Sequence, residues 1–192
     1  MKQLVITRAH YDEIIAHALA EAPNEVCGLL SGRDGIADAV WRGRNVAANP
    51  RLDYELEPQM VLKQLEFAEQ GKEMVAIYHS HPESPAYPSA IDALRAYYPD
   101  SIYVICSLMG GRPGLAAFRI IQGAVEPAAL PADATRVRGR SDLRMRYAAA
   151  DGGRPARYEL YTIAAGQQIS RQIVEIEEVE IVLIGGSLHP EA

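Results

Sequence analysis

The chain has 192 residues, 48% hydrophobic and 23% charged, which is typical of a globular protein with one well-packed domain, or with one domain and a small appendage. No apolar run approaches the roughly 20 residues that span a bilayer, and the N-terminal residues lack the apolar segment and cleavage site of an export signal. The net charge of −6 argues against non-specific nucleic-acid binding. We therefore expect a soluble, cytoplasmic protein that binds neither membranes nor nucleic acid.

The first part of the chain predicts strands alternating with helices. Residues 4–7 alternate as a short strand, and residues 8–20 carry apolar side chains at helical spacing. Residues 26–32 and 36–43 predict a hairpin joined by a Gly-Arg-Asp-Gly turn. After a loop, Pro58 occupies the position where a first-turn proline opens a second helix.

The central part predicts two buried strands separated by a loop and a helix. Residues 74–79 form a nearly continuous apolar run, as expected of a central strand. Three prolines in residues 82–88 require a stiff loop, and a serine N-cap opens a helix over residues 89–98. Residues 101–108 and 115–121 predict a pair of core strands. The predicted fold is α/β, a mixed sheet sandwiched by helices.

The composition divides the chain into three segments. Residues 1–130 form the predicted compact domain, residues 131–157 a Pro/Ala/Arg-rich linker, and residues 158–192 a small β extension of unknown role. We interpret the arginine cluster in the middle segment as part of a solvated linker. Its members are Arg136, Arg138, Arg140, Arg144 and Arg146.

The cysteines do not predict a disulfide or a metal site. Cys27 and Cys106 lie far apart, and neither belongs to a Cys-x-x-Cys pair. We expect both to be small buried hydrophobic residues.

Two histidines predict a metal site at the end of the central strand. In an extended chain, His79 and His81 project to the same side and can share one metal ion. A catalytic zinc commonly has three protein ligands and one water. Asp92, in the first turn of the following predicted helix, is the leading third ligand. Asp100 lies further off, beyond that helix.

A zinc hydrolase also needs a proton acceptor, usually a glutamate. Glu25 directly precedes a predicted strand and is one candidate. Glu55, Glu57 and Glu83 are the others, and residue types alone leave the choice open. Ser89 has two compatible roles, as the helix N-cap and as a group that stabilises an oxyanion at the metal.

The spacing resembles a known motif. His79-Ser80-His81, seven residues, Ser89, two residues and Asp92 follow the H-x-H-x7-S-x2-D pattern of the JAMM (MPN-plus) metallopeptidases. Glu25, in the run NEVCGLLSG, stands where that family has its glutamate, and this run resembles the prokaryotic branch. The resemblance covers about residues 2–125.

The resemblance implies a cytidine-deaminase-like fold and a zinc-dependent (iso)peptidase with one zinc per chain. His79, His81 and Asp92 would bind zinc, Glu25 would act as general base and acid, and Ser89 would stabilise the tetrahedral intermediate. The expected substrate is a ubiquitin-like or sulfur-carrier protein, cut after its Gly-Gly tail. We expect the tail to dock on an edge strand near residues 45–57.

Two other functions and the oligomeric state are weighed against this one. A catalytically silent MPN-type scaffold that only binds partners normally lacks the metal ligands, which this chain retains. A zinc deaminase requires a Pro-Cys-x-x-Cys ligand pair, which the sequence lacks. The sequence is also compatible with a homodimer.

Overall fold

The computed structural model describes residues 3–185. Contacts between these residues divide them into two units. The first unit comprises residues 3–87, 100–118 and 178–185, and the second comprises Pro88–Pro99 and Arg119–Glu177. In this part of the chain, every helix is too short or too polar to cross a membrane.

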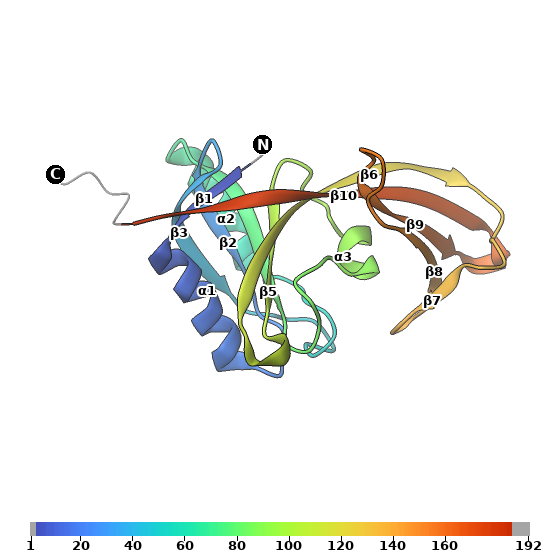
Figure 1. The fold of residues 1–192 in the computed structure, drawn as a ribbon, viewed down its shortest axis with the longest axis horizontal. Coiled ribbons are helices and arrows are strands. Elements are labelled where there is room, and N and C mark those ends of the chain that lie inside the picture. The colour runs from blue at the N-terminus through green and yellow to red at the C-terminus, as the bar shows by residue number, and fades with distance from the viewer. Residues whose placement is uncertain (1–2, 186–192) are drawn as a thin grey trace. The chain divides into compact units, whose positions relative to one another are not determined.

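The elements follow one another as strands with interspersed helices (Figure 1). The α-helices are α1 (Arg8–Glu21), α2 (Pro58–Glu69) and α3 (Ala90–Leu94). The strands of the first unit are β1 (Gln3–Thr7), β2 (Cys27–Arg33), β3 (Ile36–Gly43), β4 (Glu73–His81) and β5 (Ile102–Ser107). Those of the second unit are β7 (Thr135–Val137), β8 (Arg140–Ala148) and β9 (Ala156–Ile163). The long strands β6 (Gly114–Pro127) and β10 (Ile169–Ile184) have residues in both units.

The first unit contains a mixed sheet with the strand order β1-β3-β2-β4-β5-β6. Strand β2 is antiparallel to β3 and β4, whereas β4 is parallel to β5. The end of β10 pairs in parallel with β1. This arrangement confirms the predicted mixed α/β sheet and the hairpin of residues 26–43.

Helices cover opposite faces of this sheet. Leu30 packs in one buried cluster with Ile14 of α1, and Figure 1 shows α1 along the sheet. Leu29 points to the other face, where its cross-strand partner Trp41 contacts Phe67 of α2 with ring centroids 5.6 Å apart. The predicted sandwich is therefore confirmed.

A glycine in β2 makes room for a buried tyrosine of β4. Gly28 lies opposite Tyr78, and a Cβ atom at Gly28 would approach the Tyr78 ring to 2.4 Å. The Tyr78 side chain is fully buried, and its hydroxyl lies 2.8 Å from Nδ1 of His17 on α1. Glycine is needed here because any side chain would displace the ring that connects β4 to α1.

Both cysteines are free thiols and fully buried, as predicted. Burial raises the pKa of Cys27 to about 12, with smaller contributions from Glu57 and Glu25. Burial also raises the pKa of Cys106 to about 12. The thiols are therefore packing groups rather than nucleophiles.

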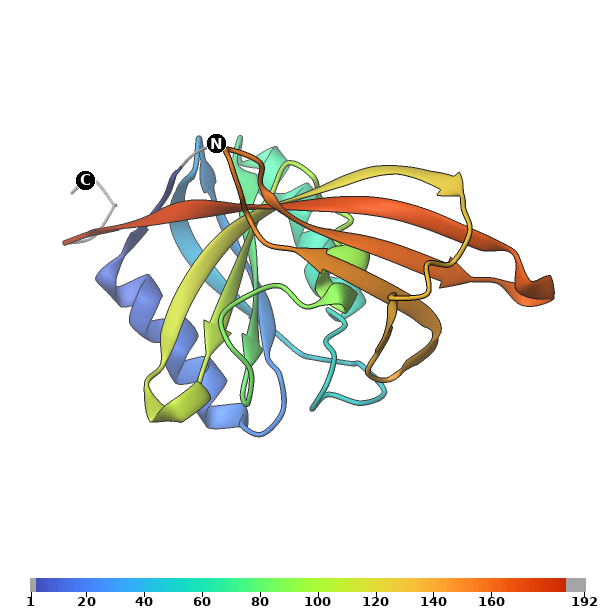
Figure 2. The same ribbon diagram turned by 45° about the vertical axis from the view of Figure 1, so that its right-hand side comes forward.

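The second unit contains an antiparallel sheet with the strand order β6-β10-β9-β8-β7. Helix α3 also belongs to this unit. Figure 2 shows its long strands running side by side. Leu143, Leu160 and Val174 are buried on β8, β9 and β10. Tyr158 of β9 donates a hydrogen bond of 2.8 Å to the carbonyl oxygen of Pro88, ahead of α3.

The secondary structure of the second unit differs from two of the sequence predictions. The helix predicted over residues 89–98 ends at Leu94, where the side-chain amide of Gln122 donates to the carbonyl oxygens of Ala93 and Leu94. The predicted linker, residues 131–157, contains β7 and β8. The buried Leu143 explains this, because it anchors an otherwise arginine-rich strand. The boundaries between the three predicted segments, at residues 130 and 157, stay predictions.

Candidate metal centre

Strand β4 presents both predicted histidines at its end. His79 is fully buried and His81 is 5% exposed. Their Nε2 atoms lie 3.1 Å apart. Two nitrogen ligands of a tetrahedral metal at about 2.0–2.1 Å would be separated by about 3.4 Å, so the imidazoles are close to the geometry that a shared ion requires.

The backbone of the following loop orients His81. Its Nδ1 atom lies 2.8 Å from the carbonyl oxygen of Pro85. A carbonyl oxygen only accepts hydrogen bonds, so Nδ1 carries a proton, and in the neutral ring Nε2 then keeps its lone pair. This arrangement is common for metal-binding histidines.

Tyr54 was not predicted from the sequence and stacks on His79. The ring centroids lie 4.4 Å apart, and the ring planes differ by 18°. Tyr54 belongs to the loop between β3 and α2. This loop holds an isolated bridge between Asn45 and Leu56, so the edge strand expected near residues 45–57 is wrong.

Ser89 and Asp92 form a capping box at the start of α3. The Ser89 hydroxyl accepts a hydrogen bond of 3.1 Å from the Asp92 backbone, and Asp92 Oδ2 accepts one of 2.7 Å from the Ser89 backbone. The N-cap prediction for Ser89 is confirmed. The cap also fixes the Asp92 carboxylate on the first turn.

The candidate ligands are His79, His81 and Asp92. One ligand atom of each lies within 4.8 Å of the others, so these three side chains can hold a metal ion. Two imidazole nitrogens and a carboxylate oxygen suit zinc among the common metals. Asp100 is exposed and is not part of this group.

Glu25 lies two residues before β2, the strand that pairs with the histidine strand β4. Cys27 pairs with His79, and the backbone amide of Ser80 donates to the carbonyl oxygen of Val26. Continued by two residues beyond the start of β2, the same antiparallel register would bring Glu25 opposite His81. Glu25 is 9% exposed.

The other glutamates suit the role less well. Glu83 is exposed and pairs with Arg51, and Glu57 accepts a hydrogen bond from the backbone amide of Arg44. Glu55 is exposed. The backbone of Glu25, in contrast, is fixed by the β3–α2 loop, because its carbonyl oxygen accepts a 2.9 Å hydrogen bond from the Asn45 side chain.

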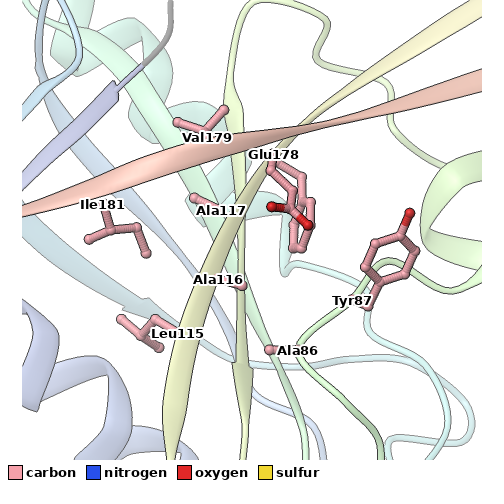
Figure 3. A pocket seen from close by; sticks show the side chains of 9 residues that line it. Ala86, Tyr87, Leu115, Ala116, Ala117, Glu178, Val179 and Ile181 are labelled. Carbon is pink, nitrogen blue, oxygen red and sulfur yellow. The ribbon is translucent and has the colours of Figure 1, made fainter. Parts of the chain in front are cut away.

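A cavity of about 300 Å³ lies elsewhere in the first unit, between β6 and the end of β10 (Figure 3). Leu115 and Ile181 line one end of it, and Tyr87 and Glu178 line the other. The histidines do not line this cavity. The site is therefore identified by its donor atoms rather than by the size of a pocket.

Residues 7–121 match the family model described as prokaryotic homologs of the JAB domain. This match covers more than half of the chain and contains Glu25, both histidines, Ser89 and Asp92. The chain belongs to this family, the prokaryotic branch of the JAMM-type proteins.

Two relatives match part of the chain. A desampylase from Haloferax volcanii is 45% identical over 104 residues, which are 50% of this chain and 74% of the relative. A CysO-cysteine peptidase from Mycobacterium tuberculosis is 37% identical over 127 residues, which are 64% of this chain and 86% of the relative.

The fold is also found in a solved structure. A protein from Desulfitobacterium hafniense superposes with a TM-score of 0.61 and 23% identity, covering 98% of this chain and 100% of the other. The likeness supports the fold, including strands beyond residue 121.

Proposed function

We propose that the protein is a zinc-dependent metallopeptidase that cleaves after the C-terminal Gly-Gly tail of a ubiquitin-like or sulfur-carrier protein. The observation that carries this proposal is the group of His79, His81 and Asp92, whose ligand atoms lie within 4.8 Å of one another. The names of the relatives support the substrate class, because one is a desampylase and another a CysO-cysteine peptidase. Both names imply removal of a group from a small carrier protein.

His79, His81 and Asp92 would hold one zinc ion per chain. When bound, zinc polarises a carbonyl group and lowers the pKa of a water molecule to about 7. The hydrogen bond to the Pro85 carbonyl supports this role, because it orients His81 through Nδ1 and leaves Nε2 for the metal. The capping box supports it as well, because it orients the Asp92 carboxylate.

Glu25 would transfer the proton. As general base it accepts a proton from the attacking water, and as general acid it gives that proton to the departing amine. Its position two residues before Cys27, which pairs with His79, and its fixed backbone support this assignment. The protonated carboxyl group would thus let the amine leave as a neutral molecule, because an amide anion is a poor leaving group.

Ser89 would stabilise the carbonyl oxygen that becomes negative during attack. Its hydroxyl oxygen accepts the capping hydrogen bond from Asp92, which leaves the hydroxyl hydrogen to be donated. The structural and catalytic roles are therefore compatible.

The glycines of the tail suit a site that is crowded by side chains. Tyr54 stacks on His79, and both histidines are buried. A substrate segment without side chains can approach such a site more closely than other residues.

Cleavage of two defined substrates tests the proposal. A carrier with a Gly-Gly tail is joined either to a lysine of a reporter protein or to a single cysteine, and the products are identified by mass spectrometry. We expect hydrolysis after the second glycine, loss of activity on chelation and recovery with zinc. Cleavage that resists chelation, or a zinc-loaded protein that cleaves neither substrate, would contradict the proposal.

A further inference from the structure

Four side chains form a row across the sheet of the second unit. Arg136 of β7 lies opposite Arg144 of β8, Arg144 lies opposite Tyr161 of β9, and Tyr161 lies opposite Arg171 of β10. Residues directly opposite one another in antiparallel strands share a face. These residues, named here the arginine row, therefore lie on one face of four adjacent strands.

Two members of the arginine row form no ion pair within residues 3–185, although Arg144, after the hydrogen-bonded Arg140, also helps to lower the pKa of Asp142 on the same strand. In the described part of the chain, ion pairs are found for Arg171 with Glu126 but not for Arg136 or Arg144. The guanidinium of Arg144 donates to the backbone carbonyl oxygens of Ser141 and Leu143. This differs from the neighbouring Arg146, which pairs with Asp133 and Glu159.

The sheet holds these charges at a cost. Like charges directly opposite each other destabilise a strand pair. Arg136 and Arg144 also lie on paired strands, next to a shift of register between Arg136 and Val137, rather than on a flexible linker. Tyr161 lies between Arg144 and Arg171 and is only 2% exposed, so its ring is packed among the side chains of the row.

We propose that the arginine row is a docking surface for an acidic face of the carrier protein. This inference rests on the proposed function and adds a recognition site outside the residues matched by the family model. Guanidinium groups on adjacent strands bind carboxylates in planar, paired hydrogen bonds. A bound carboxylate would also relieve the repulsion between Arg136 and Arg144.

The distribution of charge favours a protein patch over a nucleic acid. Residues 136–157 contain seven arginines and two aspartates, whereas the whole chain has a net charge of −6, so the rest of the chain is strongly acidic. A long polyanion would be repelled by that remainder. A compact acidic patch would be attracted to the arginine row and repelled elsewhere, which orients the partner.

Binding of short labelled polymers tests the surface without requiring catalysis. The probes are a Glu-Gly repeat peptide, a Gln-Gly repeat of equal length and an oligothymidylate, measured by fluorescence anisotropy. The Arg136→Glu/Arg144→Glu variant is compared with Arg112→Glu/Arg154→Glu, which changes net charge equally at two exposed arginines outside the row. Circular dichroism verifies that each variant is folded.

We expect the acidic peptide to bind the wild type and to lose about tenfold or more in affinity with Arg136→Glu/Arg144→Glu. The control pair and an Arg136→Lys/Arg144→Lys variant should retain most of the affinity. Equal losses in both glutamate pairs, or tighter binding of oligothymidylate than of the acidic peptide, would overturn the proposal.

Kinetics separate this proposal from the proposed function. With an acidic carrier conjugate, the row variant should raise KM about tenfold and leave kcat unchanged. Peptide binding with the expected pattern but no hydrolysis would reject the proposed function alone. Hydrolysis with an unchanged KM in the row variant, without peptide binding, would reject the docking surface alone.

Discussion

Nδ1 of His81 donates to the carbonyl oxygen of Pro85 over 2.8 Å, and the backbone amide of Tyr87 donates to the same oxygen. The loop that follows β4 therefore sets the orientation of a candidate ligand. Partners of this kind typically contribute a factor of 10–100 in metal affinity.

Pro85→Gly should lower zinc affinity by about tenfold, because the loop loses the restriction that fixes its carbonyl group. Competition with a chromophoric chelator measures the affinity. Pro113→Gly, in the turn between β5 and β6, is the matched control. Equal affinity in the two variants would show that the loop does not orient His81.

Tyr54 should support the metal centre through its ring, which stacks on His79. Stacked aromatic pairs contribute about 0.5–1.5 kcal/mol, so Tyr54→Leu should weaken zinc binding severalfold, whereas Tyr54→Phe should keep it. The same chelator competition applies. A loss in Tyr54→Phe as large as that in Tyr54→Leu would contradict the stacking argument.

The sequence predicted the parts of the site that depend on local pattern. The apolar run before His79 predicted β4, and Ser89 predicted the start of α3. The contribution of Tyr54 was missed because it depends on the path of an irregular loop. The end of α3 was missed because its carbonyl groups are bound by Gln122, far along the chain.

The sequence of β8 contains an alternating pattern that indicates a strand, although its composition suggests a linker. In β8, Leu143 and Met145 alternate with Arg144 and Arg146, which is the period of a half-buried strand. The high arginine content favoured a linker instead. Alternation was the better guide, because Leu143 is fully buried.

His17 should make stability depend on pH. Burial lowers the pKa of His17 below 6.5, and its Nδ1 faces the hydroxyl of Tyr78, whose pKa is raised by burial. The neutral imidazole is thus favoured in the folded state, so the unfolded state binds more protons as pH falls below 6.5. The stabilisation is fully present above 6.5 and is lost towards the lower folded pKa.

Urea unfolding at pH 7.5 and at pH 5.5 measures this effect. The wild type should lose more free energy of unfolding between these values than His17→Gln, which retains a hydrogen-bond acceptor but does not titrate. His10, whose pKa is also lowered by burial, is present in both proteins. Equal losses would show that His17 does not contribute.

Arg136→Glu should stabilise the protein. The change converts a like-charged pair with Arg144 into an attractive pair, with an expected gain of about 0.5 kcal/mol. Calorimetry should show a small rise in Tm. Arg138→Glu, in the turn and outside the arginine row, should give less. A lower Tm for Arg136→Glu would contradict the repulsion inferred for this pair.

Glu25→Gln separates metal binding from proton transfer and tests the central claim. The amide has nearly the same shape but cannot accept the proton, so zinc content should stay at one per chain while kcat for a Gly-Gly carrier conjugate falls by at least about 100-fold. Zinc is measured by mass spectrometry on the same samples. Retention of zinc with activity within tenfold of the wild type would contradict the role of Glu25 and the mechanism that depends on it.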